Sequence, residues 1–230
     1  MIKNIIFDLG GVLVGLDGQR CIDAFNAIGC ERVAEYVRLR LTADLFLDIE
    51  EGSIDTAEFC AEVRRMTNCT ATDHEIIGAW NTLLTEITDE RKQRLKELRR
   101  AGYKVFLLSN TNDMHWEYTK ELLGNEEGGM RSEECGVRNE ECGVRSEECG
   151  VRNVECGMYF DCVFLSYRMH LSKPDVRIFE EVLRQAGLQA EETLFIDDSR
   201  DNIQAAASLG IHTYLNEKID NWLHEDALLQ

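Results

Sequence analysis

The chain lacks any apolar run of the roughly 18–20 residues that a membrane-spanning helix requires. Its first residues also lack the basic region, long apolar stretch and small-residue cleavage site of a secretion signal. Proline is nearly absent as well, with Pro174 the single example in 230 residues. We therefore expect a cytoplasmic protein that does not bind a membrane.

Positive charge is scarce too, with 25 Lys and Arg against 43 Asp and Glu, a formal net charge of -18. A phosphate backbone rewards clustered Lys and Arg, so this balance argues against a nucleic-acid partner. A small anion remains possible as a ligand, provided that its site carries positive groups. The length and the 44% hydrophobic content predict one large α/β domain, or a core domain with a smaller insertion.

The nine cysteines include no C-x-x-C pair. Four belong to a repeat, and the other five are scattered along a chain that is neither short nor evidently secreted. Those five are Cys21, Cys30, Cys60, Cys69 and Cys162. We predict reduced thiols rather than a disulfide framework.

The repeat covers residues 129–156 and has a seven-residue period, GMRSEEC, GVRNEEC, GVRSEEC, GVRNVEC. A glycine in each unit costs about 1 kcal/mol in a helix interior, and the apolar content is too low for a coiled-coil seam. We interpret the repeat as a solvated low-complexity insertion in a surface loop of the core. A surface helix, or a metal or redox role for Cys135, Cys142, Cys149 and Cys156, stays open.

Short apolar runs that end in polar residues predict buried parallel strands. They lie at residues 3–7 before Asp8, 103–108 before Ser109, 162–165 before Ser166, and 193–196 before Asp197. Helical patterns at about 89–100 and 175–186 lie between them, and a further strand is expected around His212 and Tyr214. This alternation predicts an α/β fold, a doubly wound parallel sheet with helices on both faces.

Residues 18–86 contain helical patterns, such as Ala24 to Val37 and Thr56 to Met66, but no comparable strand. We expect a helical cap at 18–86, inserted into a catalytic core formed by 1–17 and 87–230. Ligands of parallel sheets bind at the carboxyl ends of the strands, which is where the polar residues of the predicted strands fall.

Those polar residues suit phosphoryl chemistry. Asp8 offers a carboxylate, Ser109 and Asn110 offer short hydrogen-bonding groups, Lys173 is a cation, and Asp197-Asp198 is a carboxylate pair. Mg²⁺ prefers a few carboxylates completed by water and substrate phosphate. A carboxylate nucleophile, a metal and a lysine together would support displacement at phosphorus.

Four segments in this order resemble the motifs of the haloacid dehalogenase (HAD) superfamily. They are Phe7-Asp8-Leu9-Gly10-Gly11-Val12-Leu13, Ser109-Asn110-Thr111, Ser172-Lys173-Pro174-Asp175, and Ile196-Asp197-Asp198-Ser199 with Asn202. The resemblance covers nearly the whole chain apart from the repeat, and the helical insertion resembles the family's type-1 cap. With Asn112 and His115, the second motif is similar to the bacterial α-D-glucose-1-phosphate phosphatase branch.

This resemblance implies roles for individual residues. Asp8 would be the nucleophile and a Mg²⁺ ligand, with the Gly10 backbone carbonyl and Asp198 as further ligands and Asp197 acting through water. Ser109 and Lys173 would hold the phosphate, with Lys173 also part of the catalytic set. Asn110 would bind phosphate or orient the substrate or the phosphoenzyme.

Gly10 departs from the pattern, because most phosphatases of the family carry a second Asp there as general acid and base. Losing such a group typically costs about 10²–10⁴-fold in rate. Gly10 keeps the carbonyl but transfers no proton, which favours good leaving groups such as anomeric phosphates. Asp17 and His115 are candidate replacements; otherwise Asp17 is a linker carboxylate and His115 a helix-surface residue.

The leading hypothesis is a Mg²⁺-dependent phosphatase acting on a small phosphorylated metabolite of the sugar-phosphate type. A haloacid dehalogenase is disfavoured, because the Asp197-Asp198 pair would only repel without a cation. The non-enzymatic alternative is a phosphate-binding protein that lost turnover with the second Asp. The sequence leaves the ester and the oligomeric state undetermined, with a monomer as the default.

Overall fold

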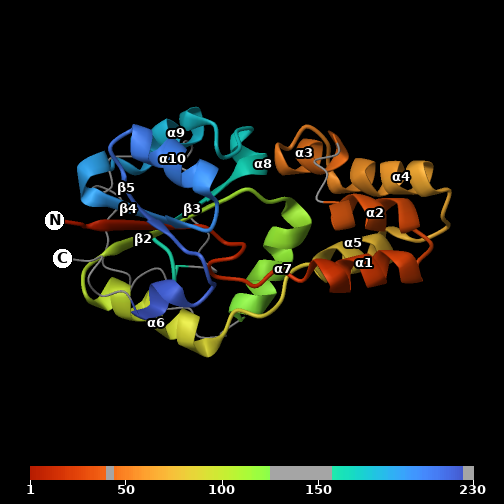
Figure 1. Ribbon diagram of the computed structural model, residues 1–230, viewed down its shortest axis with the longest axis horizontal. Coiled ribbons are helices and arrows are strands. Elements are labelled where there is room, and N and C mark those ends of the chain that lie inside the picture. Colours follow the sequence, from red (N-terminus) through yellow and green to blue (C-terminus); the bar gives the residue numbers. More distant parts are fainter. Residues whose placement is uncertain (40–43, 125–156, 225–230) are drawn as a thin grey trace, which may run out of the picture.

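A computed structural model describes residues 1–39, 44–124 and 157–224. The repeat at 129–156 lies outside these residues. The described chain forms a five-stranded parallel sheet with a separate helical lobe at one end (Figure 1). No described helix is long and apolar enough to cross a membrane.

The sheet has the order β3-β2-β1-β4-β5, and all neighbouring strands are parallel. Its strands are β1 (Asn4–Phe7), β2 (Lys104–Ser109), β3 (Cys162–Leu165), β4 (Thr193–Asp197) and β5 (His212–Leu215). The chain starts in the middle at β1, extends one side through β2 and β3, and then the other through β4 and β5. Such a reversal of direction creates a ligand crevice at the carboxyl ends of the strands.

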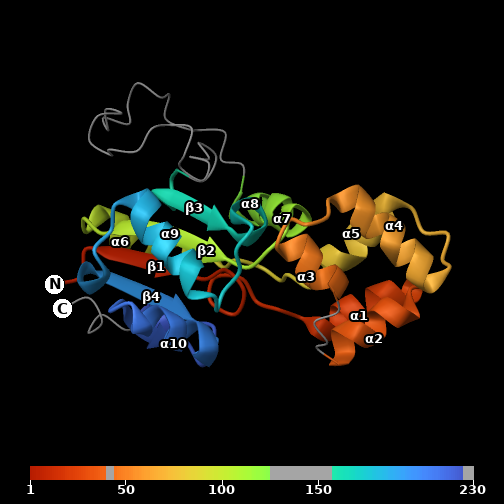
Figure 2. The same cartoon turned by 90° about the horizontal axis from the view of Figure 1, so that it is seen from above.

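Helices cover both faces of the sheet, as predicted (Figure 2). They are α6 (Asp89–Arg100), α7 (Asp113–Leu123), the short α8 (Ser166–Met169), α9 (Val176–Ala186) and α10 (Arg200–Ser208). Alternate residues of each strand face opposite layers, so Ile5 packs in the cluster with α6 and α7, while Ile6 packs with α9 and α10. Both faces of β1 to β4 are buried, which explains why these strands are largely apolar, whereas the edge strand β5 is partly exposed.

The described residues of the helical lobe form five helices, whose shared core also includes Met114 of the core helix α7. They are α1 (Gly18–Ala27), α2 (Glu31–Leu39), α3 (Asp44–Glu50), α4 (Thr56–Thr67) and α5 (Asp73–Asn81). Asp55 and Thr72 begin α4 and α5 with reciprocal capping boxes.

One helical pattern that was predicted in this lobe is not a single helix. The segment Ala24 to Val37 is two helices, α1 and α2, separated at Gly29, which has a left-handed φ of 75°. Glycine adopts this conformation without the steric cost that other residues incur. The amphipathic spacing continues across the turn, so periodicity alone did not reveal the break.

The lobe joins the core through two chain segments that run side by side. The Asp17 N–H donates to the Leu83 carbonyl and the Thr85 N–H donates to the Gly15 carbonyl, each at 2.8 Å. Side chains also bridge the two parts, since the Thr56 hydroxyl of α4 donates to the Asp113 carboxylate of α7 at 2.6 Å. The lobe is thereby held over the carboxyl edge of the sheet.

Candidate active site

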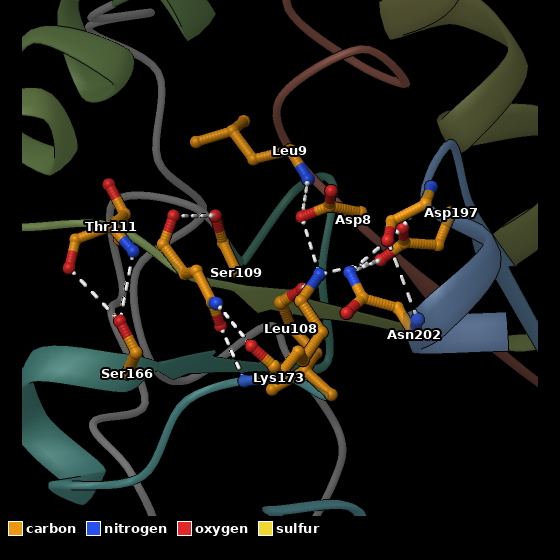
Figure 3. Close-up of polar contacts among 11 residues, drawn as sticks. Asp8, Leu9, Leu108, Ser109, Thr111, Ser166, Lys173, Asp197 and Asn202 are labelled. Carbon is orange, nitrogen blue, oxygen red and sulfur yellow. Dashed lines mark hydrogen bonds and ion pairs between the residues drawn. The ribbon is translucent and has the colours of Figure 1, made fainter. Parts of the chain in front are cut away.

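The carboxyl edge of the sheet brings together Asp8, Ser109, Lys173 and Asp197, all of them predicted site residues (Figure 3). Asp8 follows β1, Ser109 ends β2, and Asp197 ends β4. Lys173 comes from the segment between α8 and α9 and points at the two carboxylates. Three strands and one loop therefore bring together groups that are far apart in the sequence.

Lys173 is the centre of the site. Its Nζ lies 2.8 Å from Asp8 Oδ1 and 2.7 Å from Asp197 Oδ2, and it donates to the Leu108 carbonyl at 3.1 Å. Burial opposes its charge, but the carboxylates of Asp8 and Asp197 outweigh burial and raise the pKa of Lys173. The ammonium therefore stays charged in a buried position, where it can neutralise an anion.

Asn110 positions this lysine. Its side-chain amide donates to the Lys173 carbonyl at 2.8 Å, and its oxygen accepts from the Lys173 N–H at 2.8 Å. These two bonds fix the backbone from which the lysine side chain extends. The observed contacts of the Asn110 amide are thus with the protein backbone, whereas the family resemblance implied a contact with phosphate or substrate.

Asp197 is fully buried, and both of its oxygens have donors. Oδ1 accepts from the Ser199 N–H at 2.8 Å, and the Asn202 amide lies 3.0 Å from each oxygen. With Lys173 on Oδ2, little of the carboxylate is left for a direct ligand bond. Asp198, by contrast, is exposed and free to face a ligand.

Asp8 is buried next to these groups. Its Oδ1 accepts from the Leu9 N–H at 2.7 Å and faces Lys173. Burial raises the pKa of Asp8 to about 7, with Lys173 opposing the increase and Asp197 adding to it.

The three carboxylates form a cluster that fits a metal cation. One oxygen each of Asp8, Asp197 and Asp198 lies within 4.8 Å of the others. Lys173 supplies one positive charge against these three carboxylates, so the cluster has excess negative charge and only oxygen donors. That donor set is the one that Mg²⁺ prefers.

Gly11 makes this cluster possible. Its φ is 72°, and a Cβ built there would lie 2.3 Å from Asp198 Oδ2. A side chain at this position would displace the carboxylate. This steric requirement could not be predicted from the sequence.

Gly10 has a different environment. A Cβ there would meet the Leu16 side chain at 3.3 Å, and Leu16 is 52% exposed and able to move aside. The backbone at Gly10 is not among those with positive φ. The missing second carboxylate is therefore not imposed by backbone conformation.

The two candidate proton donors have structural contacts. Asp17 caps α1 by accepting from the Arg20 N–H at 2.9 Å. His115 is 5% exposed, stacks on Trp80 with ring centroids 4.8 Å apart, and its Nε2 lies 3.2 Å from the Trp80 carbonyl. The interpretation of His115 as a surface histidine was wrong, because α5 covers it. Burial lowers the pKa of His115 to about 4.

Glu50 is a residue that the sequence analysis missed. It ends α3 in the lobe, and its carbonyl accepts from the Ser166 hydroxyl at 2.6 Å. The same Ser166 oxygen accepts from the Thr111 N–H at 2.9 Å, which connects Glu50 to the loop after β2. Glu50 lies in an acidic run, and nothing in that run distinguishes it from Asp48 or Glu51.

The Glu50 carboxyl interacts electrostatically with the centre of the site. Burial raises its pKa to about 7, and the charge of Asp8 adds to this effect while Lys173 opposes it. In the described part of the chain, its side chain has no hydrogen-bond or salt-bridge partner. The lobe therefore contributes a carboxyl group whose electrostatic surroundings include Asp8 and Lys173.

Known proteins resemble this chain over nearly its full length. A curated D-ribitol-5-phosphate phosphatase of Bacteroides thetaiotaomicron is 28% identical over 98% of this chain and 97% of its own length. The sesquiterpene phosphatase astK of Aspergillus oryzae is 40% identical over 91% of this chain and 87% of its own.

A solved structure shows the same fold. The HAD family enzyme bt-2542 of Bacteroides thetaiotaomicron, in complex with magnesium and inorganic phosphate, is 37% identical with a TM-score of 0.74. The match covers 94% of each chain. A family model described as haloacid dehalogenase-like hydrolase matches residues 2–210. The chain therefore belongs to the haloacid dehalogenase-like hydrolase family, and it is a HAD-type phosphatase.

Proposed function

We propose that this chain is a Mg²⁺-dependent phosphatase that hydrolyses a small phosphomonoester of a sugar or sugar alcohol. The observation that carries the proposal is the buried Asp8 beside Lys173, at a carboxylate cluster that fits a cation. The relative named for D-ribitol 5-phosphate and the neighbour that holds magnesium and phosphate support the substrate class and the metal.

In this proposal the metal would be held by Asp8, Asp198 and the Gly10 carbonyl. Asp197 acts through water, since its own oxygens are occupied by Lys173, Ser199 and Asn202. Bound Mg²⁺ supplies positive charge that reduces the repulsion between the phosphate and the carboxylates.

The chain's own groups carry the steps. An Asp8 oxygen attacks phosphorus, the bond to the ester oxygen breaks, and an aspartyl phosphate forms. Lys173 and Ser109 hold the phosphoryl oxygens during this transfer. Water then attacks the aspartyl phosphate, releasing inorganic phosphate and restoring Asp8.

The departing ester oxygen requires a proton when it belongs to an alcohol. We propose that Glu50 supplies it. Its backbone carbonyl is held by the Ser166 hydroxyl, which also accepts from the Thr111 N–H after β2, and its carboxyl interacts electrostatically with Asp8 and Lys173. A pKa near 7 lets this group give a proton and take one back at neutral pH. Asp17 and His115 fit less well, since the first caps a helix and the second is stacked on Trp80.

We further propose that the helical lobe at 18–86 is a cap over a core of 1–17 and 87–230. The paired linkers at Gly15–Thr85 and Asp17–Leu83 support these boundaries. In such an arrangement, side chains of the lobe determine which alcohol part of the ester is accepted, while the core binds the phosphate.

The function is tested by phosphate release from D-ribitol 5-phosphate, α-D-glucose 1-phosphate and related esters, with Mg²⁺ or with EDTA. We expect release that depends on Mg²⁺ and is fastest with a sugar or sugar-alcohol phosphate. A folded protein that binds inorganic phosphate but releases none from any ester would instead be a binding protein.

The role of Glu50 is tested with Glu50→Gln, using Asp48→Asn in the same acidic run as the matched control. We expect about 10²-fold slower hydrolysis of an alkyl phosphate and much less change with p-nitrophenyl phosphate, whose leaving group needs no proton. In the wild type, activity on the alkyl ester should fall above about pH 7, where Glu50 loses its proton, and this decline should vanish in Glu50→Gln. An equal loss on both esters would show that Glu50 only positions the lobe.

A further inference from the structure

Two thiols of the helical lobe lie almost in bonding contact. The Sγ atoms of Cys30 and Cys69 are 3.1 Å apart, although the residues are 39 positions apart in the sequence. Cys30 lies between α1 and α2, and Cys69 lies between α4 and α5. A disulfide requires about 2.05 Å, so a small side-chain rotation separates the present geometry from a covalent bond.

The surrounding backbone brings the two turns together. Gly29 and Asn68 both adopt left-handed conformations, with φ of 75° and 55°, and each reverses the chain beside its cysteine. A Cβ built on Gly29 would lie 3.9 Å from the Cys69 Cβ. Both views place these turns at the end of the lobe that is distant from the sheet (Figures 1 and 2).

The two thiols have different environments. Cys69 is partly exposed, whereas Cys30 is buried. Burial opposes ionisation of Cys69, but hydrogen bonds with Thr67, Cys30 and the backbone, together with the Arg64 charge, lower its pKa. Burial raises the pKa of Cys30 to about 12, with the contact to Cys69 adding to the increase. Cys69 thus has the accessible, thiolate-forming character of an attacking thiol.

We propose that Cys30 and Cys69 form a redox-active pair that closes to a disulfide when the protein meets a low-molecular-weight disulfide such as glutathione disulfide. The Cys69 thiolate attacks one sulfur of the oxidant, forms a mixed disulfide and expels one glutathione thiolate. The Cys30 thiol gives up its proton and attacks the Cys69 sulfur, expelling the second glutathione. Two protein thiols are oxidised and one glutathione disulfide is reduced to two glutathione molecules.

Closure would link the α1–α2 turn to the α4–α5 turn within one lobe. The bond lowers the conformational entropy of the unfolded chain and thereby stabilises the folded lobe. Because both turns lie away from the carboxyl edge of the sheet, the Asp8 site keeps its geometry. The pair is therefore expected to change the stability of the lobe and to leave phosphate release nearly unchanged.

The test treats the full-length protein with a glutathione redox buffer, blocks the remaining thiols, and maps peptides without reduction. Trypsin cuts after Arg20, Arg32, Arg65 and Arg91, so the cross-link joins peptide 21–32 to peptide 66–91. We expect this peptide, a rise in melting temperature of about 5 °C or more, and reversal of both by dithiothreitol.

Matched variants assign the bond. Cys69→Ser and Cys30→Ala should each abolish the cross-linked peptide and the rise in melting temperature. Cys21→Ser should retain both, and it removes the second cysteine from peptide 21–32. Recovery of Cys30 and Cys69 as free thiols would overturn the proposal, as would a stable glutathione adduct on Cys69 that Cys30 never displaces.

Discussion

The carboxyl edge of the sheet and the helical lobe are built from different chemistry. At the sheet edge, buried charges face one another, with Lys173 between Asp8 and Asp197. The lobe is centred on the aromatic rings of Phe25, Phe46, Phe59 and Trp80, with ring centroids 4.8 to 6.2 Å apart. Charge chemistry restricts the sheet edge to particular residue types, whereas packing accepts many apolar residues of similar volume. The residue types of the core therefore indicate the reaction class, whereas the residue types of the lobe do not indicate which ester is bound.

The largest effect should come from breaking the charge arrangement of the core. Lys173→Met leaves the carboxylates of Asp8 and Asp197 buried without their shared cation. We expect a loss of about 3–5 kcal/mol in the free energy of unfolding, measured by urea denaturation, together with loss of phosphate release. The exposed Lys104→Met is the control and should change stability by no more than about 0.5 kcal/mol. Equal stability of the two variants would show that the buried pair contributes little.

A smaller effect should separate the two neighbouring glycines. Gly11→Ala places a Cβ on the Asp198 carboxylate and forces a side chain into a left-handed conformation, so we expect about 10²-fold slower turnover and weaker Mg²⁺ binding. Gly10→Ala meets only the movable Leu16 side chain and should stay within about threefold of the wild type. The ratio of the two rates, each measured across a Mg²⁺ titration, checks this expectation. Similar rates for the two variants would contradict the steric role of Gly11.

The boundary between the two regions should respond to pH through His115. Its pKa is lowered from 6.5 to about 4 in the fold, so the unfolded chain binds a proton more readily. The contribution of His115 to stability should therefore fall as pH decreases from about 6.5 to about 4, by up to about 3 kcal/mol. Glu50 and Asp8 contribute in the opposite direction over this range, because their pKa values are raised.

The pH dependence is assigned by comparing urea denaturation of His115→Gln with that of His74→Gln, which alters an exposed histidine of α5. As pH falls from about 6.5 to about 4, the free energy of unfolding of His115→Gln should rise relative to that of His74→Gln, because the first variant lacks the His115 contribution. The same pH dependence in both variants would show that His115 does not contribute.

Most of the core could be predicted from the sequence, because β1 to β4 are largely apolar runs that end in a polar residue or directly precede one. The parallel sheet, its helices on both faces and the magnesium-phosphatase class followed from this pattern and from the four motifs. The order of the strands did not, since it depends on which crossovers pack best. The break at Gly29 was also hidden, because the apolar spacing of α1 continues into α2.

Contacts that depend on three-dimensional placement were the other gap. Residue types do not encode distances, and three features depend on them. These are the steric role of Gly11, the hydrogen bonds of Asn110 to the Lys173 backbone, and the electrostatic interaction of Glu50 with Asp8. The 39-residue separation of Cys30 and Cys69 likewise gave no sign of their contact.

The most direct test of the account compares Asp8→Asn with the wild type for phosphate release in the presence of Mg²⁺. The amide keeps the size of the side chain but lacks the nucleophilic oxygen, so we predict a loss of about 10⁴-fold or more in a protein that remains folded. Rapid quenching of the wild type should also trap a phosphorylated peptide that contains Asp8. Full turnover by a folded Asp8→Asn would contradict the account, because the phosphoryl group would then be transferred without this carboxylate.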